Sequence, residues 1–257
     1  MNKLKEKVRQ KKPIAGTHVF LPDPNVSEII GNLGFDFIWI DTEHTTIDYS
    51  ILQMHLIAAA ATGTPAIVRV PWNDPILVKR VIDMGPDGIV FPMINSAEDA
   101  ELAMKSCIYP PHGIRGWGPT RAIRYGLDDK MTYIREGHRE LCRFVQIESV
   151  EAVKNLKEII QNPWIDGYIF GPCDLSASIG ELYQMYEEHT VALIDEAVAI
   201  LKEYDKYFGV SCSTLPDVLS FWHKRGVRMI SAGMDYAYIV KGGQEALSAI
   251  QKTQKQK

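Results

Sequence analysis

Short, nearly continuous runs of apolar and β-branched residues recur along the chain and alternate with longer segments of helical periodicity. The runs cover residues 14–19, 36–41, 66–70, 88–92, 143–147, 167–170, 207–211 and 228–232. Apolar runs without polar alternation are typical of parallel strands that are buried on both faces. In the segments between them, apolar residues return every three or four positions, as Leu52, Leu56 and Ala59 do, which predicts amphipathic helices.

An alternation of strand and helix that repeats eight times predicts an α/β fold of the (β/α)8 or TIM-barrel type. A doubly wound open sheet is the structural alternative, but the Gly-x-Gly-x-x-Gly turn that follows its first strand is missing. No Gly/Ser-rich linker or shift in composition divides the chain, so we expect a single domain over residues 1–257. The polar residues 251–257 form a tail that we expect to fray.

Composition and charge exclude several classes of function. The 257 residues include 28 Lys and Arg against 32 Asp and Glu, a net charge of −4 that gives no broad attraction to nucleic acid or anionic membrane. Residues 1–12 lack the apolar core of a secretory signal, and no stretch of about 18 apolar residues is present to span a membrane. Cys107, Cys142, Cys173 and Cys212 form no Cys-x-x-Cys pair, so we expect reduced thiols in a cytoplasmic protein.

The segment 109–126 breaks the alternation of strand and helix. It contains four Gly, three Pro and three Arg, a composition that cannot form a helix across its length. It is either a plain surface loop or a loop over the mouth of the barrel, and we favour the second because long ordered loops in compact domains tend to carry function. We expect Arg115, Arg121 and Arg124 to serve an anionic substrate or a subunit contact.

Ionisable residues gather where the predicted strands end, which is where a TIM barrel carries its active site. Glu148 and Asp174 follow two neighbouring strands, and two unpaired carboxylates at one height repel each other. A divalent cation removes this conflict, and two carboxylates without thiolate or imidazole beside them suit a hard ion that keeps its waters, Mg²⁺ or Mn²⁺. The alternative is that each carboxylate pairs with an arginine or, for Asp174, caps a helix.

Arg69 and His44 are the candidate catalytic groups beside this pair. An arginine within an apolar strand needs an anion, so Arg69 either forms a structural ion pair with Asp41 or Glu43 or stabilises negative charge on a substrate oxygen. His44 lies three residues after Asp41 and is either a base near neutral pH or a hydrogen-bonded rim residue. No lysine ends a predicted strand, which favours a metal mechanism over an imine mechanism.

Five short motifs resemble those of a known family. They are WIDTEH at 39–44, VRVP at 68–71, PPHGIRG at 110–116, QIE at 146–148 and GPCDLS at 171–176. In this order, over roughly residues 13–250, they resemble the HpcH/HpaI aldolases, metal-dependent class II pyruvate aldolases of the 2-dehydro-3-deoxyglucarate and 4-hydroxy-2-oxoheptanedioate type. The resemblance implies a barrel of the phosphoenolpyruvate/pyruvate-domain type.

The resemblance also implies roles for single residues. Glu148 and Asp174 match the ligands of the divalent metal, and Arg69 matches the arginine that stabilises the pyruvate enolate. His44 matches a base that acts through a water. Asp83 matches a carboxylate that raises the basicity of this histidine, and Asp41 matches a residue that helps to orient it. The groups that hold the 2-oxo acid are matched by Gln146 and by the backbone at Cys173 and Asp174. Cys173 departs from the usual alanine or asparagine, which leaves the backbone amide in place.

By this resemblance the chain is an enzyme, a carbon–carbon lyase. It would cleave a 4-hydroxy-2-oxo acid reversibly into pyruvate and an aldehyde through a metal-bound pyruvate enolate, and it would assemble into a hexamer with a terminal helix exchanged between subunits. A citrate-forming or oxaloacetate-decarboxylating enzyme on the same scaffold is one alternative. A non-catalytic barrel that binds an oxo acid is another, and the presence of Arg69, His44, Glu148 and Asp174 speaks against it, because a binder needs no base.

Overall fold

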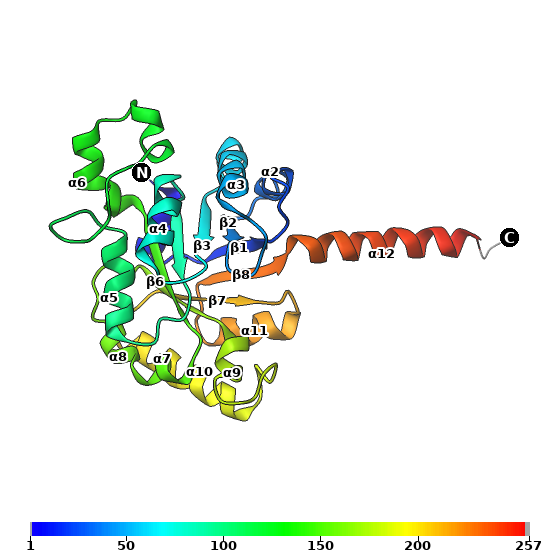
Figure 1. Ribbon diagram of the computed structural model, residues 1–257. Coiled ribbons are helices and arrows are strands. Elements are labelled where there is room, and N and C mark those ends of the chain that lie inside the picture. The colour runs from blue at the N-terminus through cyan, green and yellow to red at the C-terminus, as the bar shows by residue number, and fades with distance from the viewer. Residues whose placement is uncertain (1, 255–257) are drawn as a thin grey trace.

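Eight parallel strands close into a barrel in the computed structural model, which describes residues 2–254 (Figure 1). Each strand pairs with the next along the chain, and β8 closes the ring against β1. The predicted (β/α)8 fold and its eight strands are confirmed. The strands are β1 (Ile14–Val19), β2 (Phe37–Asp41), β3 (Ala66–Arg69), β4 (Gly88–Phe91), β5 (Cys142–Ile147), β6 (Gly167–Phe170), β7 (Phe208–Cys212) and β8 (Met229–Met234).

Most of the helices form an outer layer around the strands. Ser149 begins one of them, because its hydroxyl accepts a hydrogen bond from the amide of Ala152 at 3.0 Å. Gly63 ends another at φ 72°, a left-handed conformation that glycine adopts without steric cost. The helices are α1 (Lys3–Arg9), α2 (Asn25–Gly31), α3 (Tyr49–Thr62), α4 (Pro75–Asp83), α5 (Ala97–Ser106), the 3-10 helix η1 (Arg121–Gly126), α6 (Lys130–Glu140), α7 (Val150–Lys154), α8 (Leu156–Ile159), α9 (Pro172–Ala177), α10 (Glu188–Glu203), α11 (Pro216–Lys224) and α12 (Asp235–Gln254).

Large apolar side chains fill the interior of the barrel and close one of its ends. Phe37, Trp39 and Phe144 are buried within it. Leu4 and Val8 of α1 pack against the same cluster, and because α1 precedes β1 they cover the end where the strands begin. A second apolar cluster includes residues of the strands and of the surrounding helices. The end where the strands finish is therefore the one available for a site.

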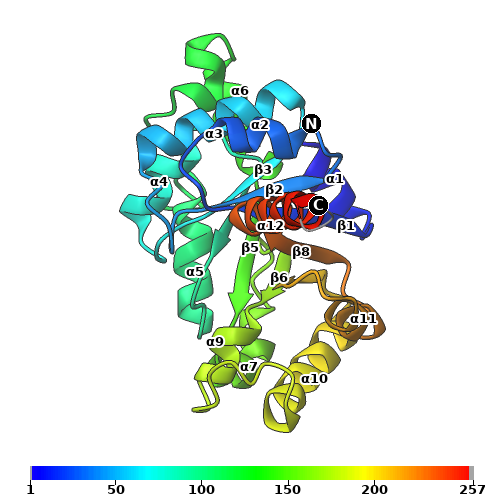
Figure 2. The ribbon, with the colours of Figure 1, turned by 90° about the vertical axis from the view of Figure 1, so that its right-hand side faces the viewer.

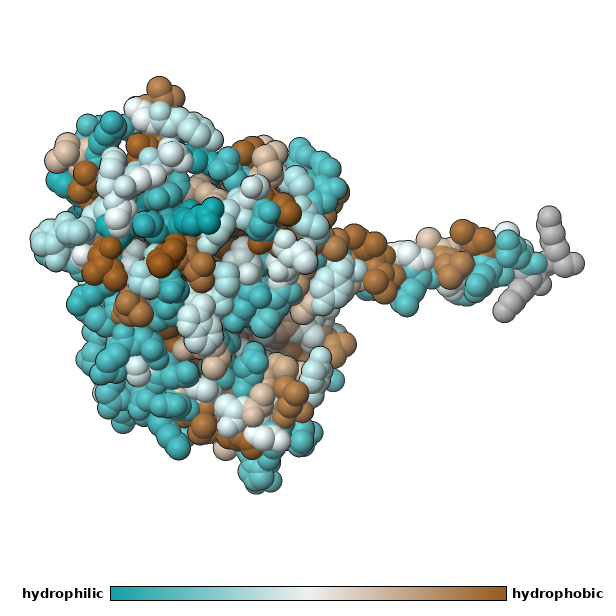
Figure 3. All heavy atoms as spheres, viewed as in Figure 1, coloured by the Kyte–Doolittle hydropathy of each residue, from teal (hydrophilic) through white to brown (hydrophobic). Residues whose placement is uncertain are grey.

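The last helix, α12, projects away from the barrel (Figures 1 and 2). Tyr238 ties its start to the barrel, because its hydroxyl lies 2.6 Å from that of Thr17 and donates to the carbonyl of Ala232 at 3.1 Å. Apolar side chains along the projecting part are brown in Figure 3. Four of these apolar residues expose more than half of their surface: Ile239, Val240, Leu247 and Ile250.

Residues 251–254 of the predicted polar tail form the last turn of α12, and residues 255–257 lie outside the described part of the chain. Between residues 2 and 254, no helix combines the length and the apolar character needed to cross a membrane.

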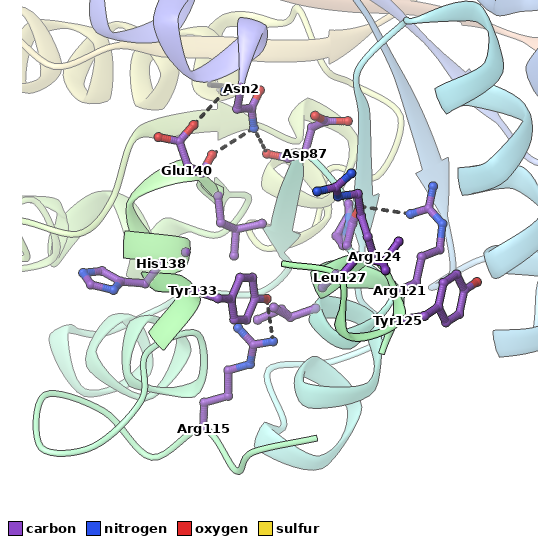
Figure 4. Close-up of a pocket in the computed structure, with 16 residues that line it drawn as sticks. Asn2, Asp87, Arg115, Arg121, Arg124, Tyr125, Leu127, Tyr133, His138 and Glu140 are labelled. Carbon is purple, nitrogen blue, oxygen red and sulfur yellow. Dashed lines mark hydrogen bonds between the residues drawn. The ribbon is translucent and has the colours of Figure 1, made fainter. Parts of the chain in front are cut away.

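The segment 109–126 does not cover the mouth of the barrel, so that prediction is wrong for this chain. The segment follows α5, and in a β/α barrel the chain that leaves a helix returns to the end where the next strand begins. Arg121 accordingly donates to the carbonyl of Met84 at 2.6 Å. The segment also lines a cavity of about 650 Å³ together with Asp87 and Leu141, which precede β4 and β5 (Figure 4).

The three arginines of this segment are bound within their own chain. Arg115 is 4% exposed and donates to Asp83 at 2.8 Å, and Arg124 pairs with Asp128. Arg121 donates to main-chain carbonyls around it. The contacts of Arg115 and Arg121 hold the segment to its own chain, and none of the contacts supports the expected role in binding an anionic substrate. The alternative role in a subunit contact stays a prediction, and the Arg124 side chain is 70% exposed.

Candidate active site

Asp41 and Arg69 form a buried ion pair at the rim where the strands end. They are the last residues of β2 and β3 and are direct register partners. Arg69 Nε donates to Asp41 Oδ1 at 2.9 Å and Nη2 donates to Oδ2 at 2.6 Å, a two-pronged contact that fixes the guanidinium plane. The Asp41 side chain is 0% exposed and that of Arg69 is 11% exposed. Burial lowers the pKa of Arg69, but the neighbouring carboxylates outweigh it, so the net shift of this pKa is upward.

Glu43 and His44 extend this network toward the solvent. Arg69 Nη1 lies 2.9 Å from Glu43 Oε2, and His44 Nε2 lies 3.6 Å from the same oxygen. The His44 side chain is 60% exposed, so its imidazole is open to substrate and water. Burial raises the pKa of Glu43, although Arg69 and His44 oppose the rise. Sequence analysis identified Glu43 only as a possible partner of Arg69, and its contact with His44 is an addition from the structure.

The predicted links from Asp41 and Asp83 to His44 are not present between the described residues. The Asp41 carboxylate holds Arg69 instead and accepts from the amide of Glu43 at 2.9 Å. Asp83 ends α4, and a helix that runs back along the barrel ends near the strand beginnings, on the side opposite to the rim. Its carboxylate accepts from Arg115 there. Within one chain, Glu43 is therefore the carboxylate beside the imidazole.

Glu148 lies directly after β5 and is only 3% exposed. Its Oε1 accepts from the main-chain amide of Met93 at 2.6 Å, and its Oε2 accepts from Gln146 Nε2 at 2.6 Å. Gln146 in turn accepts a long hydrogen bond of 3.4 Å from Arg69, which joins the two parts of the network. Burial raises the pKa of Glu148 to about 7.

A cavity of about 690 Å³ opens at this rim and gathers most of the predicted site residues. His44, Arg69, Gln146, Cys173 and Asp174 all line it. Asp174 lies in the first turn of α9, and its exposed side chain has no hydrogen-bond or ion-pair partner among residues 2–254.

Gly171 permits the close approach of the segment that carries Asp174 to the buried carboxylate. A Cβ added at this position would lie 2.6 Å from Glu148 Oε2, closer than real Cβ atoms come to other groups. The absence of a side chain therefore lets the two carboxylates share one end of the barrel, as their positions after neighbouring strands predict.

The donor set at the rim fits a hard divalent cation. No group of three or more His, Cys, Asp or Glu side chains is arranged to hold a metal ion within residues 2–254. Mg²⁺, however, commonly takes only one or two carboxylates from a protein and keeps several waters. Glu148 is buried, its pKa is raised, and the charge of Asp174 adds to that rise, so a cation between the two would relieve the cost of ionising them.

His18 also belongs to this cavity, and sequence analysis missed it. It is the next-to-last residue of β1, is 3% exposed and lines the cavity. Burial lowers the pKa of His18 to about 4. A histidine within an apolar strand departs from the pattern in the same way as Arg69 does, and this signal was sufficient to find it.

A closed parallel barrel whose ionisable side chains meet at the rim where the strands end is the architecture of TIM-barrel enzymes. The chain belongs to the HpcH/HpaI aldolase/citrate lyase family, whose family model matches residues 15–241. It is thus an enzyme of a family that makes and breaks carbon–carbon bonds.

Two curated relatives are similar over almost their whole length. A pyruvate aldolase from Rhizobium etli is 34% identical, with 97% of each chain covered. A 4-hydroxy-2-oxo-heptane-1,7-dioate aldolase from Klebsiella pneumoniae is 31% identical, with 96% of this chain and 93% of the relative covered.

Solved structures show the same fold. An HpcH/HpaI aldolase/citrate lyase family protein from Burkholderia cenocepacia matches with a TM-score of 0.91 at 27% identity, covering 98% of this chain and 100% of that one. The citrate synthase SbnG matches with a TM-score of 0.87 at 25% identity, covering 98% of this chain and 99% of that one.

Proposed function

We propose that the chain is a divalent-metal-dependent class II aldolase that cleaves a 4-hydroxy-2-oxo acid reversibly into pyruvate and an aldehyde. The observation that carries the proposal is the arrangement at the rim, where a fixed guanidinium, an exposed imidazole and a free carboxylate share one cavity above a buried carboxylate. A largely buried guanidinium is suited to stabilise the negative charge that develops when the carbon–carbon bond breaks.

The residues of the chain divide the reaction among them. Gln146 and the main-chain amides at Cys173 and Asp174 hold the 2-oxo acid, and Arg69 donates to the oxygen on which the enolate charge develops. His44, through a water, takes the proton of the 4-hydroxyl group while the C3–C4 bond breaks, so that the hydroxyl-bearing carbon leaves as an aldehyde. The proton taken from the 4-hydroxyl group then returns through the water to C3 of the enolate, which leaves as pyruvate.

Glu148 and Asp174 would hold the cation, Mg²⁺ or Mn²⁺, which when bound supplies a Lewis acid for the oxygens of the 2-oxo acid. The Met93 amide and Gln146 fix the carboxylate of Glu148 for this purpose. Glu148 must be ionised to act as a ligand, so its raised pKa makes retention of the ion depend on pH near 7.

The direct test is an assay of pyruvate released from a panel of 4-hydroxy-2-oxo acids that differ in their aldehyde half, coupled to lactate dehydrogenase. Arg69→Ala is expected to lower turnover by about 10²–10³, the usual effect of removing one charge-stabilising donor. Wild-type turnover in this variant, or turnover that survives exhaustive chelation, would contradict the proposal.

A citrate-forming enzyme is the second candidate, favoured by the likeness to citrate synthase SbnG over nearly the whole chain. Product analysis separates the two functions. Pyruvate and an aldehyde formed from the 4-hydroxy-2-oxo acid support the aldolase, whereas citrate formed from oxaloacetate supports the alternative.

We also propose that the enzyme is a homo-oligomer, a hexamer by family resemblance. Ile239, Val240, Leu247 and Ile250 expose apolar surface along one projecting helix. A row of this kind costs free energy in water unless another copy covers it.

A further inference from the structure

The cavity at the rim has a wall without ionised side chains. The lining residues from the region of β1, β7 and β8 include His18, Ser211, Cys212, Gly233 and Met234. These three strands are consecutive in the closed barrel, and β8 and β1 lie across the ring from β4 and β5. Arg69 and Asp174, the charged groups of the proposed chemistry, come from β3 and α9 instead.

His18 connects the three strands of this neutral wall. Its Nδ1 lies 3.0 Å from the carbonyl oxygen of Gly233, and its Nε2 lies 3.1 Å from the hydroxyl of Ser211. Because burial lowers the pKa of His18 to about 4, the ring carries one N–H at neutral pH. A carbonyl oxygen only accepts hydrogen bonds, so this N–H is on Nδ1 and Nε2 is left as an acceptor.

The Ser211 hydroxyl must therefore donate its hydrogen to His18 Nε2. The serine oxygen keeps its lone pairs, and Ser211 is partly exposed and lines the cavity. The ring centroids of Phe20 and Trp39 lie 6.2 Å and 5.0 Å from the centroid of the imidazole, and these rings restrict its movement. The Ser211 oxygen can therefore accept a hydrogen bond from a ligand in the cavity, while the hydroxyl hydrogen stays bonded to His18.

We propose that Ser211, oriented by His18, selects aldehydes that carry a hydroxyl group, an inference that rests on the proposed aldolase function. The 2-oxo acid half of the substrate is anionic and belongs beside Arg69, which leaves the aldehyde half for the neutral wall. A hydroxyl group of the aldehyde donates a hydrogen bond to the Ser211 oxygen. An alkyl group leaves this oxygen without a donor, and a carboxylate, which only accepts hydrogen bonds, is repelled by it. Ser211 is a specificity-determining residue and His18 is a positioning residue.

The test compares the condensation of pyruvate with 2-hydroxypropanal and with propanal, two aldehydes that differ by one hydroxyl group. The measured quantity is the ratio of the two kcat/KM values with Mg²⁺ present, and the intrinsic reactivities of the aldehydes cancel when variants are compared. Ser211→Ala is expected to lower this ratio about tenfold through the loss of one hydrogen bond.

Ser231→Ala is the matched control. Ser231 is the register partner of Ser211 on β8, and its hydroxyl lies 3.4 Å from His18 Nδ1. It is fully buried and does not line the cavity. This variant also removes a serine hydroxyl that contacts the imidazole of His18, and it should keep the wild-type ratio of the two kcat/KM values.

Two variants of His18 test its positioning role. His18→Phe keeps a ring but frees the hydroxyl of Ser211 to turn, so the ratio should fall. His18→Gln supplies an amide oxygen that accepts from Ser211, so it should restore part of the ratio. A merely structural role would lower kcat/KM equally for both aldehydes and would show no such rescue.

A wild-type ratio in Ser211→Ala, or an equal loss in Ser231→Ala, would overturn the inference and leave the aldolase function intact. Failure of the wild-type enzyme to condense pyruvate with either aldehyde would overturn the proposed function and this inference with it. A ratio that falls in Ser211→Ala while propanal turnover persists supports the assignment.

Discussion

Replacing Arg69 by methionine separates the structural role of this residue from its chemical one. Arg69 neutralises the carboxylate of Asp41, which is 0% exposed, and also contacts Glu43. Removal of one partner from a buried ion pair costs about 3–5 kcal/mol, because the other charge is left without compensation. The double variant Arg69→Met with Asp41→Asn removes that charge and keeps an acceptor for the amide of Glu43, so most of the lost stability should return.

Urea unfolding of the metal-free enzyme at a fixed protein concentration measures the free energies, and pyruvate release measures turnover. The turnover of both variants should be about 10²–10³-fold lower than that of the wild type, because neither has the guanidinium. Lys105→Met is the control: it breaks an exposed pair with Glu101, with side chains 47% and 52% exposed, and should change stability by less than about 1 kcal/mol.

Two outcomes would refute this reasoning. If the double variant regained turnover together with stability, Arg69 would be a structural residue only. If Arg69→Met were as stable as the wild type, Asp41 would not carry an uncompensated buried charge.

The pKa of Glu148 in the folded enzyme, about 7, lies above its ordinary 4.5, so this group destabilises the metal-free enzyme increasingly as pH rises from 4.5 through 7. Glu148→Gln should therefore be more stable than the wild type at pH 8 by up to about 3 kcal/mol, measured by urea unfolding. This difference in stability should vanish toward pH 4.5, and a difference that does not depend on pH would contradict the argument from burial. Gly171→Ala places a Cβ 2.6 Å from Glu148 Oε2 and should weaken Mn²⁺ binding measured by water-proton relaxation, and unchanged binding would show that the close approach is not needed. Leu247→Asp with Ile250→Asp should shift the enzyme toward smaller species in analytical ultracentrifugation, and an unchanged assembly would exclude α12 as the interface.

The strands and the charged rim were predictable because their physical causes are local. A strand buried on both faces must be apolar along its length, so a polar residue at its end stands out, as Asp41 and Arg69 do. Strands that follow each other in a barrel are neighbours, and the register of these two residues follows from that order.

The misplaced residues have one common cause. Hydropathy identifies an element but does not say at which end of the barrel its flanking residues lie. Asp83 is the last residue of a helix and the segment 109–126 follows one, and this connectivity puts both at the end where strands begin, away from His44. The contact between Glu43 and His44 depends on the path of a short connection, and the proton position on His18 depends on burial and on the carbonyl of Gly233.

Exchange of the C3 protons of pyruvate with deuterium, followed by proton NMR in D₂O with Mg²⁺ or Mn²⁺ present, tests most directly whether this rim stabilises an enolate. The wild-type enzyme should catalyse the exchange, and Arg69→Ala should slow it by about 10²–10³. A folded wild-type enzyme that leaves the methyl protons unexchanged at saturating pyruvate and metal would contradict the account.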